Sequence, residues 1–481
     1  MPAPSLTGRG AGLARFLIGA WLLAAFQYAS AALPVEVAAA LAAERIPASN
    51  AALWVQELGA PAPLVQHNET LPMNPASVIK LLTTYAGLEL LGPAFTWKTE
   101  AWTAAPLAAG VLQGDLVLRG GADPRFTFEN FWLMLRALRG RGVRDIRGDL
   151  VLDRSWLETG AYDPARFDGK PTQPYNARPD ALLLNFNAFR FSFLPDAEHR
   201  AVDLLSEPPS SRLEVVNEVR YADGPCTDWR SQLTAQFRPS ALGTRAVFSG
   251  TYPGACGDNT WNVAPIGHSE YLYGVFRKLW LDLGGTLDGL WREAPLPQGA
   301  RLLYRYESPS LAEAVQGINK YSNNVMARQL FLDLSAELEG PPGRAERSAA
   351  LVKSWLAEKG LAMPELVLEN GSGLSRLERI SAQSLGRLLA AAYASDVMPE
   401  FMSSLPVVAV DGTMRRRLRG ESVSGHGHIK TGSLNGARSI AGYLLDRHGR
   451  RNVVVFMINH PNAAASQSAM DALLRWVYAR P

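Results

Sequence analysis

The hydrophobic pattern at the start of the chain changes from short strand-length segments to a longer apolar run. Apolar-rich segments cover 51–58 and 64–67, with a Gly-Ala-Pro turn between them. Two strand-length segments joined by a tight turn predict a β-hairpin. The apolar run over 77–91 stops at a Gly-Pro pair and predicts a helix. A shorter run over 35–43 predicts another helix before the hairpin.

From about residue 95 the pattern shortens to strand-length segments with few helices. Strands are predicted over 97–102, 111–118, 145–152, 188–193, 200–205, 212–219 and 245–250. Helices are predicted over 128–138 and 268–283, and a polar loop rich in Pro, Asp and Asn covers 162–179. Residues 96–300 are therefore predicted to form a β-rich insertion of one or two small domains.

Helical spacing returns after residue 305. Helices are predicted over 310–318, 325–338, 345–359, 381–395 and 466–478, and strands over 426–431, 438–446 and 452–459. Together with the N-terminal hairpin, these elements predict an α+β domain. It would have a five-stranded antiparallel sheet, terminal helices on one face and a helical cluster on the other. The insertion would split this domain into residues 32–95 and 301–481.

The first 31 residues have the pattern of a bacterial secretory signal peptide. Arg9 and Arg15 precede an apolar stretch over 16–28, and Ala29-Ser30-Ala31 offers a small-residue cleavage site. An uncleaved anchor is the alternative, but the apolar stretch is short for a membrane span. Cleavage after Ala31 predicts an exported protein, with the periplasm of a Gram-negative bacterium as its destination.

Composition and charge exclude some partners, and export makes the cysteines informative. The formal net charge of +3, which falls to +1 without the two leader arginines, is too small to argue for nucleic acid as a partner. The chain has two cysteines, Cys226 and Cys256, both in Gly/Pro-rich loops. In an oxidising compartment such a pair is expected to form a disulfide, and two free thiols are the alternative.

Residues that can carry chemistry first gather at the start of the helix predicted over 77–91. Ser77 and Lys80 are three residues apart, so they lie on one helical face within hydrogen-bonding reach. A serine hydroxyl needs a base to become a nucleophile, and a lysine kept neutral by burial or a nearby cation can be that base. Alone the pair is weak evidence, because Ser is common at helix starts and Lys is common one turn later.

Two further motifs follow in the second part of the split domain. Ser322-Asn323-Asn324 lies between two predicted helices, and Lys430-Thr431-Gly432-Ser433 lies on a predicted strand. Taken alone, the first is explained by helix capping and the second by an exposed strand end. The order and the flanking elements of all three motifs favour a single serine-nucleophile active site.

The three motifs resemble the S-x-x-K, S-x-N and K-T-G signature of the serine penicillin-recognising enzymes. The long insertion and Asn370-Gly371-Ser372-Gly373-Leu374-Ser375-Arg376 resemble one branch, the class C low-molecular-mass penicillin-binding proteins. These are the D-alanyl-D-alanine carboxypeptidase/endopeptidases of peptidase family S13, and the resemblance covers nearly all of the mature chain. The chain departs from the family at Asn323, where Asp is frequent, and at Asn435, where some members have Gln.

Resemblance and chemistry together assign the catalytic residues. Ser77 is expected to attack a carbonyl and form an acyl-enzyme, with Lys80 taking its proton. Ser322 is expected to relay a proton to the departing amine. A neutral Lys80 needs a pKa below the free value of ~10.4, to which burial and the nearby cation Lys430 would contribute.

The same reasoning assigns the substrate-binding residues. Asn324 is expected to bind the substrate amide and the catalytic lysine. Lys430, with the hydroxyls of Thr431 and Ser433, is expected to bind a terminal carboxylate. Gly432 would let the strand approach the substrate closely. The backbone N–H groups of Ser433 and of the nucleophilic serine are expected to form an oxyanion hole.

Three assignments at the substrate end are less direct. Arg376 is placed near the substrate by the resemblance, and Asn435 occupies the position where some members have Gln. The polar loop over 162–179 is a candidate contact for the third residue of a stem peptide, because of its polarity and its place in the insertion.

Two other groupings of polar residues are candidates for chemistry. His426 and His428 share a strand face, but two ligands make a weak metal site and no neighbouring Cys or carboxylate completes it. No metal or other cofactor is expected. Asp123 and Asp153 would suit an acid–base pair if they met, but each is interpreted as a turn residue.

The resemblance implies an exported serine D-alanyl-D-alanine carboxypeptidase acting on peptidoglycan stem peptides, with endopeptidase activity on cross-links left open. β-Lactam antibiotics mimic the D-Ala-D-Ala dipeptide and are expected to acylate Ser77. A β-lactamase, a transpeptidase and a non-catalytic envelope protein that binds β-lactams or peptidoglycan are the alternatives. Peripheral association with the membrane or cell wall and homo-oligomerisation are left open.

Overall fold

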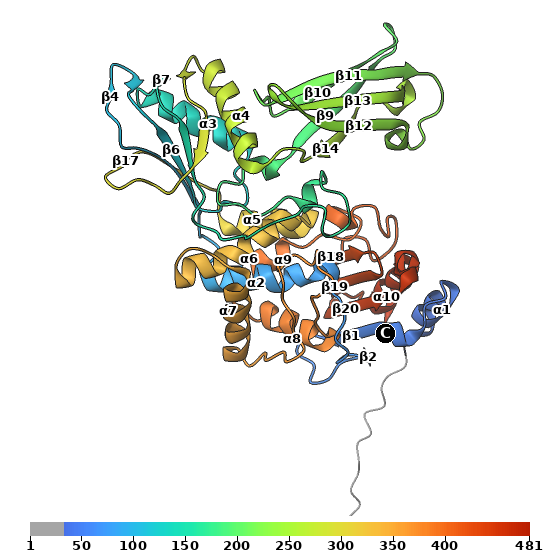
Figure 1. Ribbon diagram of the computed structural model, residues 1–481. Coiled ribbons are helices and arrows are strands. Elements are labelled where there is room, and N and C mark those ends of the chain that lie inside the picture. The colour runs from blue at the N-terminus through green and yellow to red at the C-terminus, as the bar shows by residue number, and fades with distance from the viewer. Residues whose placement is uncertain (1–32) are drawn as a thin grey trace, which may run out of the picture.

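The computed structural model describes residues 33–481, so the predicted signal peptide lies outside the described residues. Both ends of the described chain contribute to one five-stranded antiparallel sheet of order β18-β19-β20-β1-β2 (Figure 1). Its strands are β1 (Ala51–Glu57), β2 (Val65–His67), β18 (Gly427–Leu434), β19 (Ala437–Leu445) and β20 (Arg451–Asn459). The predicted sheet is therefore confirmed.

Helices cover both faces of this sheet because its central strands are apolar at consecutive positions. One face packs against α1 (Val35–Ala43) and α10 (Gln467–Ala479). The other face packs against a helical cluster. This cluster contains α2 (Lys80–Leu91), α5 (Leu311–Tyr321), α6 (Asn324–Glu339), α7 (Ala345–Glu358), α8 (Ala382–Tyr393) and α9 (Met398–Ser403). None of the helices within 33–481 is long and apolar enough to cross a membrane.

Helix α2 lies at the centre of the cluster. Every residue from Lys80 to Leu88 is buried, and Lys80 is the only charged residue among them. Burial on all sides explains why α2 lacks the polar stripe of a surface helix. It also places a lysine where an ammonium group is poorly solvated, which matters for the chemistry below.

The insertion leaves the domain after α2 and returns before α5. Its first part has a five-stranded sheet, β16-β8-β6-β3-β17, a smaller sheet, β15-β7-β5-β4, and two helices. These elements are β3 (Lys98–Thr103), β4 (Leu107–Ala108), β5 (Val111–Leu112), β6 (Leu116–Gly120), α3 (Phe128–Gly140), β7 (Asp145–Ile146), β8 (Leu150–Asp153), α4 (His268–Asp282), β15 (Thr286–Leu287), β16 (Trp291–Glu293) and β17 (Arg301–Glu307).

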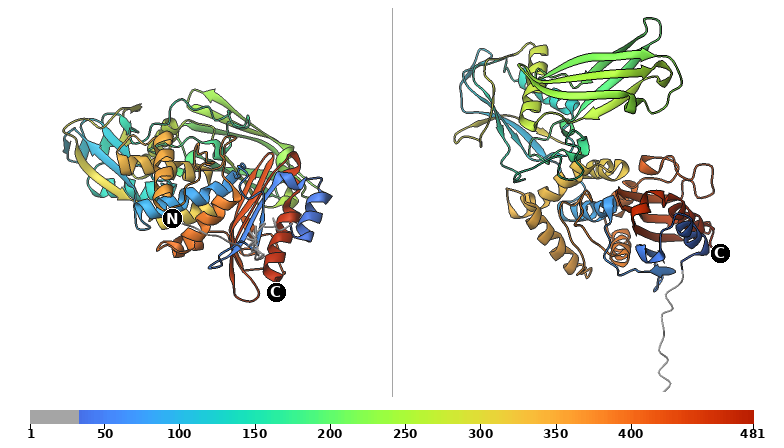
Figure 2. Two further views of the ribbon diagram at one scale, coloured as in Figure 1. Left: turned by 90° about the horizontal axis from the view of Figure 1, so that it is seen from below. Right: turned by 45° about the vertical axis from the view of Figure 1, so that its right-hand side comes forward.

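The second part of the insertion consists of two three-stranded sheets, β10-β9-β14 and β11-β13-β12. Their strands are β9 (Phe189–Asp196), β10 (Ala201–Glu207), β11 (Leu213–Ala222), β12 (Leu233–Ser240), β13 (Gly243–Pro253) and β14 (Asn259–Val263). One continuous hydrophobic cluster joins both parts. Figure 2 shows the insertion on one side of the helical cluster, away from α1 and α10.

Two predicted strands, 111–118 and 145–152, are each broken into two shorter strands. The breaks coincide, since β5 pairs with β7 and β6 pairs with β8. At both breaks the chain passes from the smaller sheet to the larger one around Gly114 and Gly148. A Cβ on Gly148 would lie 2.5 Å from the carbonyl carbon of Gly114, so this crossing requires a residue without a side chain. Periodicity alone does not reveal such a change of sheet.

Six strands of the insertion lie outside the predicted ones: β4, β12, β14, β15, β16 and β17. Three of them, β4, β15 and β16, are only two or three residues long, β12 contains Pro239, and β14 is mostly polar. In the structure β17 pairs with β3, so the sheets of the insertion extend to residue 307, past the boundary predicted at 300.

The insertion contacts α6 of the helical cluster through the segment between β8 and β9 and through Trp97, directly before β3. The Trp156 indole donates to Asp333 Oδ1 (2.8 Å), and the Trp97 indole donates to the other oxygen of the same carboxylate. Gln329 accepts the backbone N–H of Asp180 (3.0 Å) and donates to its carbonyl. These contacts place the loop over 162–179 beside α6.

The predicted disulfide between Cys226 and Cys256 is present. It joins the loop after β11 to the short 3₁₀ turn that follows β13, at one end of the second part of the insertion. The two cysteines are 30 residues apart in sequence, and both lie in the second part of the insertion. Its place in the fold indicates a role in stability, since cross-links restrict the unfolded chain.

Candidate active site

Ser77 lies in a single turn of 3₁₀ helix, Ala76–Ile79, directly before α2. The sequence predicted that the α-helix begins at Ser77, whereas it begins three residues later. The Asn74 side chain accepts the N–H of Ala76 (2.9 Å), and the Ser439 hydroxyl donates to the carbonyl two residues before Ser77 (2.6 Å). Ala76 has a φ of +47°, and such backbone strain is concentrated at functional sites.

Lys80 contacts three segments of the chain that meet at the site. Its Nζ lies 2.9 Å from Ser77 Oγ and 2.6 Å from Asn324 Oδ1, and it also donates to the carbonyl of Ser372. The amide oxygen and the carbonyl can only accept hydrogen bonds. When Lys80 is neutral, its two N–H groups bond these acceptors and its lone pair is left facing the Ser77 hydroxyl. The geometry is that of a general base beside its nucleophile.

The electrostatics of the site favour this neutral form. Burial and the positive charge of Lys430 hold the pKa of Lys80 well below its usual range, while Glu378 acts in the opposite direction. Glu378 is itself fully buried, and one of its oxygens accepts the N–H groups of Asn370 (3.0 Å) and Gly371 (2.9 Å). Burial raises the pKa of Glu378. Lys80 therefore loses its proton more readily than a solvated lysine does.

Ser322 and Lys430 form the second pair of the site. Ser322 ends α5 in the left-handed conformation, with a φ of 57°, and its hydroxyl lies 2.9 Å from Lys430 Nζ. Lys430 is buried on β18 and also donates to the carbonyl of Thr431 (2.8 Å). Burial lowers the pKa of Lys430 to about 7. A buried cation of this kind is suited to binding an anionic group.

Strand β18 lies against the Ser77 turn at Gly432. A Cβ on Gly432 would lie 2.8 Å from the Pro75 carbonyl oxygen and 3.0 Å from the Ser77 nitrogen, and would overlap the Ser439 hydroxyl. Only glycine allows this approach. The exposed residue that follows, Ser433, therefore lies beside the turn, as an oxyanion hole made from two backbone N–H groups requires.

The structure also brings together the assignments at the substrate end. The Arg376 guanidinium donates to the backbone carbonyl of Asn435 (2.8 Å), in the turn between β18 and β19. The same guanidinium lies 4.8 Å from the ring centre of Phe167, in the loop over 162–179. Three segments far apart in the sequence therefore meet at one edge of the site.

Sequence reasoning missed two residues that shape the Lys80 environment. The Ser372 carbonyl contacts Lys80, and Glu378 is the buried carboxylate behind it. The adjacent Gly373 has a φ of +80°, and a Cβ there would lie 2.8 Å from the Ser77 nitrogen. The paired glycines of this loop were the available signal, because they permit close packing on the Ser77 turn. Glu378 left no comparable signal.

Thr413 is a third residue that the sequence did not single out. Its hydroxyl lies 2.8 Å from the hydroxyl of Thr431. It belongs to a short turn, Gly412–Met414, and the preceding Asp411 forms an ion pair with Lys320 at the end of α5 (2.6 Å). The turn therefore connects α5 to the edge of β18 and orients the Thr431 side chain.

Replacing Thr413 by valine is expected to lower kcat/KM about fivefold for peptides that end in a free carboxylate, mostly by raising KM. The reason is that the Thr431 hydroxyl loses a hydrogen bond worth about 1 kcal/mol that orients it. Thr413→Ser, which keeps the hydroxyl, should stay close to the wild type. Steady-state release of D-alanine measures both, and an unchanged KM in Thr413→Val would contradict the assignment.

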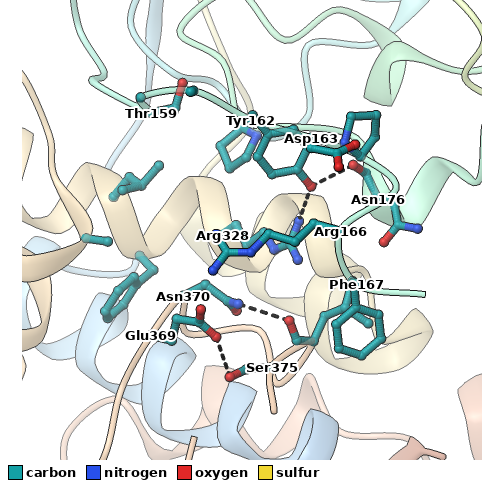
Figure 3. A pocket seen from close by; sticks show the side chains of 18 of the residues that line it. Thr159, Tyr162, Asp163, Arg166, Phe167, Asn176, Arg328, Glu369, Asn370 and Ser375 are labelled. Carbon is teal, nitrogen blue, oxygen red and sulfur yellow. Dashed lines mark hydrogen bonds between the residues drawn. The ribbon is translucent and has the colours of Figure 1, made fainter. Parts of the chain in front are cut away.

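A cavity of about 930 Å³ adjoins the site (Figure 3). Its walls come from residues 158–167 of the insertion, from α6 and α7, and from the loop over 369–377. Arg376 lines this cavity, whereas Ser77 and Lys80 do not. The cavity is therefore an extension of the site beyond the reacting atoms, and its volume is in the range of ligand-binding pockets.

The histidine pair and the aspartate pair considered as other candidate sites have structural roles instead. The His426 ring packs against Tyr478, with ring centres 5.1 Å apart, and His428 lies on β18. Within 33–481 no group of three or more His, Cys, Asp or Glu side chains is placed to hold a metal ion. Asp123 and Asp153 each accept the backbone N–H two residues further on, at 2.7 and 3.0 Å, as turn residues do.

Comparison with known proteins gives consistent matches across the chain. The model of the D-Ala-D-Ala carboxypeptidase 3 (S13) family matches residues 33–479. A D-alanyl-D-alanine carboxypeptidase from Actinomadura sp. (strain R39) is 29% identical, over 83% of this chain and 76% of the relative. The D-alanyl-D-alanine carboxypeptidase DacB of Haemophilus influenzae is 23% identical, over 82% of both chains.

The fold matches as well. The crystal structure of penicillin binding protein 4 (dacB) from Haemophilus influenzae aligns with a TM-score of 0.75 and 22% identity, over 92% of this chain and 99% of that one. The shared fold includes the insertion, since so much of both chains is covered. The resemblance drawn from the three motifs is therefore confirmed, and the protein belongs to the D-Ala-D-Ala carboxypeptidase 3 (S13) family.

Proposed function

We propose that this protein is a serine D-alanyl-D-alanine carboxypeptidase that hydrolyses peptidoglycan stem peptides through an acyl intermediate on Ser77. One observation carries the assignment of the nucleophile: Lys80 Nζ lies 2.9 Å from Ser77 Oγ, and its other two neighbours can only accept hydrogen bonds. Membership of the S13 family supports the same activity.

In the acylation step, Ser77 Oγ attacks the carbonyl carbon of the penultimate D-alanine and its proton passes to Lys80. The backbone N–H groups of Ser77 and Ser433 stabilise the negative charge that develops on the carbonyl oxygen. The C–N bond then breaks, and the departing amine takes the proton that Lys80 had accepted, relayed by the Ser322 hydroxyl, so Lys80 is neutral again for the next step. The Ser322 hydroxyl is held by Lys430. The products are an ester on Ser77 and free D-alanine.

In the deacylation step, a water molecule attacks the ester carbonyl and its proton passes to Lys80. The C–O bond to Ser77 breaks, and the proton returns from Lys80 to Ser77 Oγ. The cycle consumes one water molecule and one peptide bond. A β-lactam follows the first step but leaves a bulky acyl group that resists the second, so it inhibits the enzyme covalently.

Substrate orientation comes from groups around this pair. Lys430, with the hydroxyls of Thr431 and Ser433, binds the terminal carboxylate by charge and hydrogen bonds. Asn324 accepts from Lys80 through its oxygen, so its NH₂ group is free to bind a carbonyl of the substrate. Arg376 and Asn435 lie at the edge where the rest of the peptide leaves the site.

The place of action follows from the N-terminal sequence. Arg9, Arg15 and the apolar stretch after them support export, and Ala31 is the proposed cleavage point. The disulfide between Cys226 and Cys256 supports an oxidising compartment. The periplasm combines both conditions with access to peptidoglycan.

The adjoining cavity supports a second activity, endopeptidase cleavage of cross-linked peptides, because it offers room beyond a single stem terminus.

Incubating the protein with benzylpenicillin and measuring its intact mass tests this proposal. The wild type should gain one penicilloyl group, on the peptide that contains Ser77, whereas Ser77→Ala should gain none. The adduct should decay slowly, because a bulky acyl group blocks the attacking water. An adduct that turns over within seconds would indicate a β-lactamase instead. No adduct on folded wild-type protein would refute the acyl-serine mechanism.

A further inference from the structure

Arg328 is the most deeply buried arginine of residues 33–481, with 7% of its surface exposed. Other well-buried arginines of the described chain each pair with a carboxylate: Arg154 with Asp180, and Arg417 with Asp471. Arg328 has no carboxylate within 4 Å in the described chain. A buried charge without a counter-ion is costly, and such groups are concentrated at functional sites.

The guanidinium of Arg328 is also short of hydrogen-bond acceptors. Of its five N–H groups one has a partner within the described residues, the Tyr162 hydroxyl at 2.9 Å. The Tyr162 hydroxyl gives its own proton to the carbonyl of Asn176 (2.6 Å). The Nε of Arg328 is buried and bonds nothing. The unused donors belong to a side chain that lines the 930 Å³ cavity, where Figure 3 shows Arg328 between Tyr162 and the pair Asn370 and Glu369.

The acidic side chains that line the cavity do not supply a hydrogen-bond acceptor for Arg328. Glu158 is paired with Arg344 (2.6 Å), and Glu369 accepts from the Ser375 hydroxyl. Arginines and acidic residues line the cavity in equal number, so its net charge is close to zero. Recognition of an anion would therefore depend on the one buried guanidinium rather than on a general positive field.

The position of Arg328 relates the cavity to the catalytic residues. Asn324, whose side chain contacts Lys80, lies one helical turn before Arg328 on α6, about 6 Å along the axis and on the same face. The loop whose Ser372 carbonyl contacts Lys80 also contributes Asn370 and Ser375 to the cavity wall. Since an extended peptide advances about 3.3 Å per residue, the cavity is within reach of the one or two residues that precede the acylating D-alanine.

We propose that Arg328 binds a second carboxylate of the peptide substrate, carried by one of the two residues that precede the D-alanine attached to Ser77. This inference rests on the proposed function. The terminal carboxylate is assigned to Lys430, so Arg328 serves a different one. Its planar guanidinium can donate two parallel N–H bonds to a carboxylate. Hydrogen bonds from the same guanidinium to a neutral amide at that position are weaker, because the amide carries no charge. Arg328 is thus a specificity-determining residue for acidic peptides.

The test uses four synthetic peptides that end in D-Ala-D-Ala. They carry free carboxylates at both preceding residues, an amide at one or the other, or amides at both. For the wild type, one of the two amidations should lower kcat/KM for D-alanine release about 30-fold, and this identifies the residue that Arg328 binds. In Arg328→Met the same amidation should change kcat/KM less than about threefold. Arg344→Gln, a control on the same cavity whose side chain has its own carboxylate, should discriminate like the wild type.

The ratio of kcat/KM values for two peptides is taken within each variant. Any effect of Arg328 on the basicity of Lys80 cancels in this ratio, because both peptides react with the same enzyme. The inference is overturned if neither amidation affects the wild type, a comparison that needs no mutant to fold. It is also overturned if Arg328→Met discriminates as strongly as the wild type. Acylation by benzylpenicillin is measured alongside: normal acylation with no discrimination refutes the role of Arg328 alone, whereas absent acylation of the wild type refutes the proposed function.

Discussion

Replacing Lys80 by methionine is expected to slow acylation of Ser77 by about 10³-fold, since general-base catalysis contributes about 10²–10⁴-fold. Lys80 Nζ is the only basic group within hydrogen-bonding distance of Ser77 Oγ in the described chain. The rate of adduct formation with a fluorescent penicillin measures this directly. Lys353→Met, on the exposed side of α7, is the control and should acylate at the wild-type rate.

Stability should change in the opposite direction from activity. The pKa of Lys80 lies below that of an unfolded lysine, so protonation opposes folding at every pH below about 10.4, and the opposition fades as the pH rises to that value. Methionine has a similar volume and no charge. The Tm of Lys80→Met at neutral pH should therefore equal or exceed that of the wild type. Fast acylation by this variant would exclude Lys80 as the base.

The pH dependence of the wild type provides a second readout of Lys80. The base must be neutral, so kcat/KM should rise with pH as Lys80 loses its proton, well below the pH at which free lysine does so. Lys430 must be charged to hold a carboxylate, so kcat/KM should fall as Lys430 loses its proton, around its pKa of about 7. The profile should be bell-shaped, and Lys80→Met should lose the acidic limb.

Replacing Gly432 by alanine is expected to lower kcat/KM for peptide hydrolysis by at least about 10²-fold. The added Cβ would overlap the Ser439 hydroxyl and lie 3.0 Å from the Ser77 nitrogen, so β18 must move away from the turn. This movement separates the two N–H groups of the oxyanion hole, and the loss of one such donor costs about 10²–10³-fold in kcat. The acylation rate and steady-state hydrolysis both report it.

Gly140→Ala is the matched control for this substitution. Gly140 lies at the end of α3 in the insertion, and a Cβ there would have no neighbour within 4 Å. Its activity and Tm should equal those of the wild type. In Gly432→Ala the Tm should fall by a few degrees, because β18 also loses packing against the Ser77 turn. Wild-type hydrolysis by Gly432→Ala would show that β18 does not supply an oxyanion donor.

The sequence by itself determined the sheet and the three motifs. The strand over 51–57 and the strands near the C-terminus stand out as short runs of consecutive apolar residues, since each strand is packed between layers of helices. The same local signals marked the helix that begins after Ser77 and the loop that holds Ser322. The contact between Ser77 and Lys80 could be predicted because residues three apart on a helix are neighbours whatever the tertiary structure is.

Only the tertiary structure decided what surrounds that pair. The Ser372 carbonyl, the buried Glu378 and Thr413 reach the site from segments far from Ser77 in the sequence. Apart from the paired glycines beside Ser372, nothing in their local sequence specifies such contacts. The depressed pKa of Lys80 has the same origin, because desolvation is a property of the packed interior and not of a motif. Arg328 shows this most plainly. In sequence Arg328 is one polar residue on α6. Its burial without a carboxylate partner, which follows from the packing of α6 against the insertion, distinguishes it from the other arginines within 33–481.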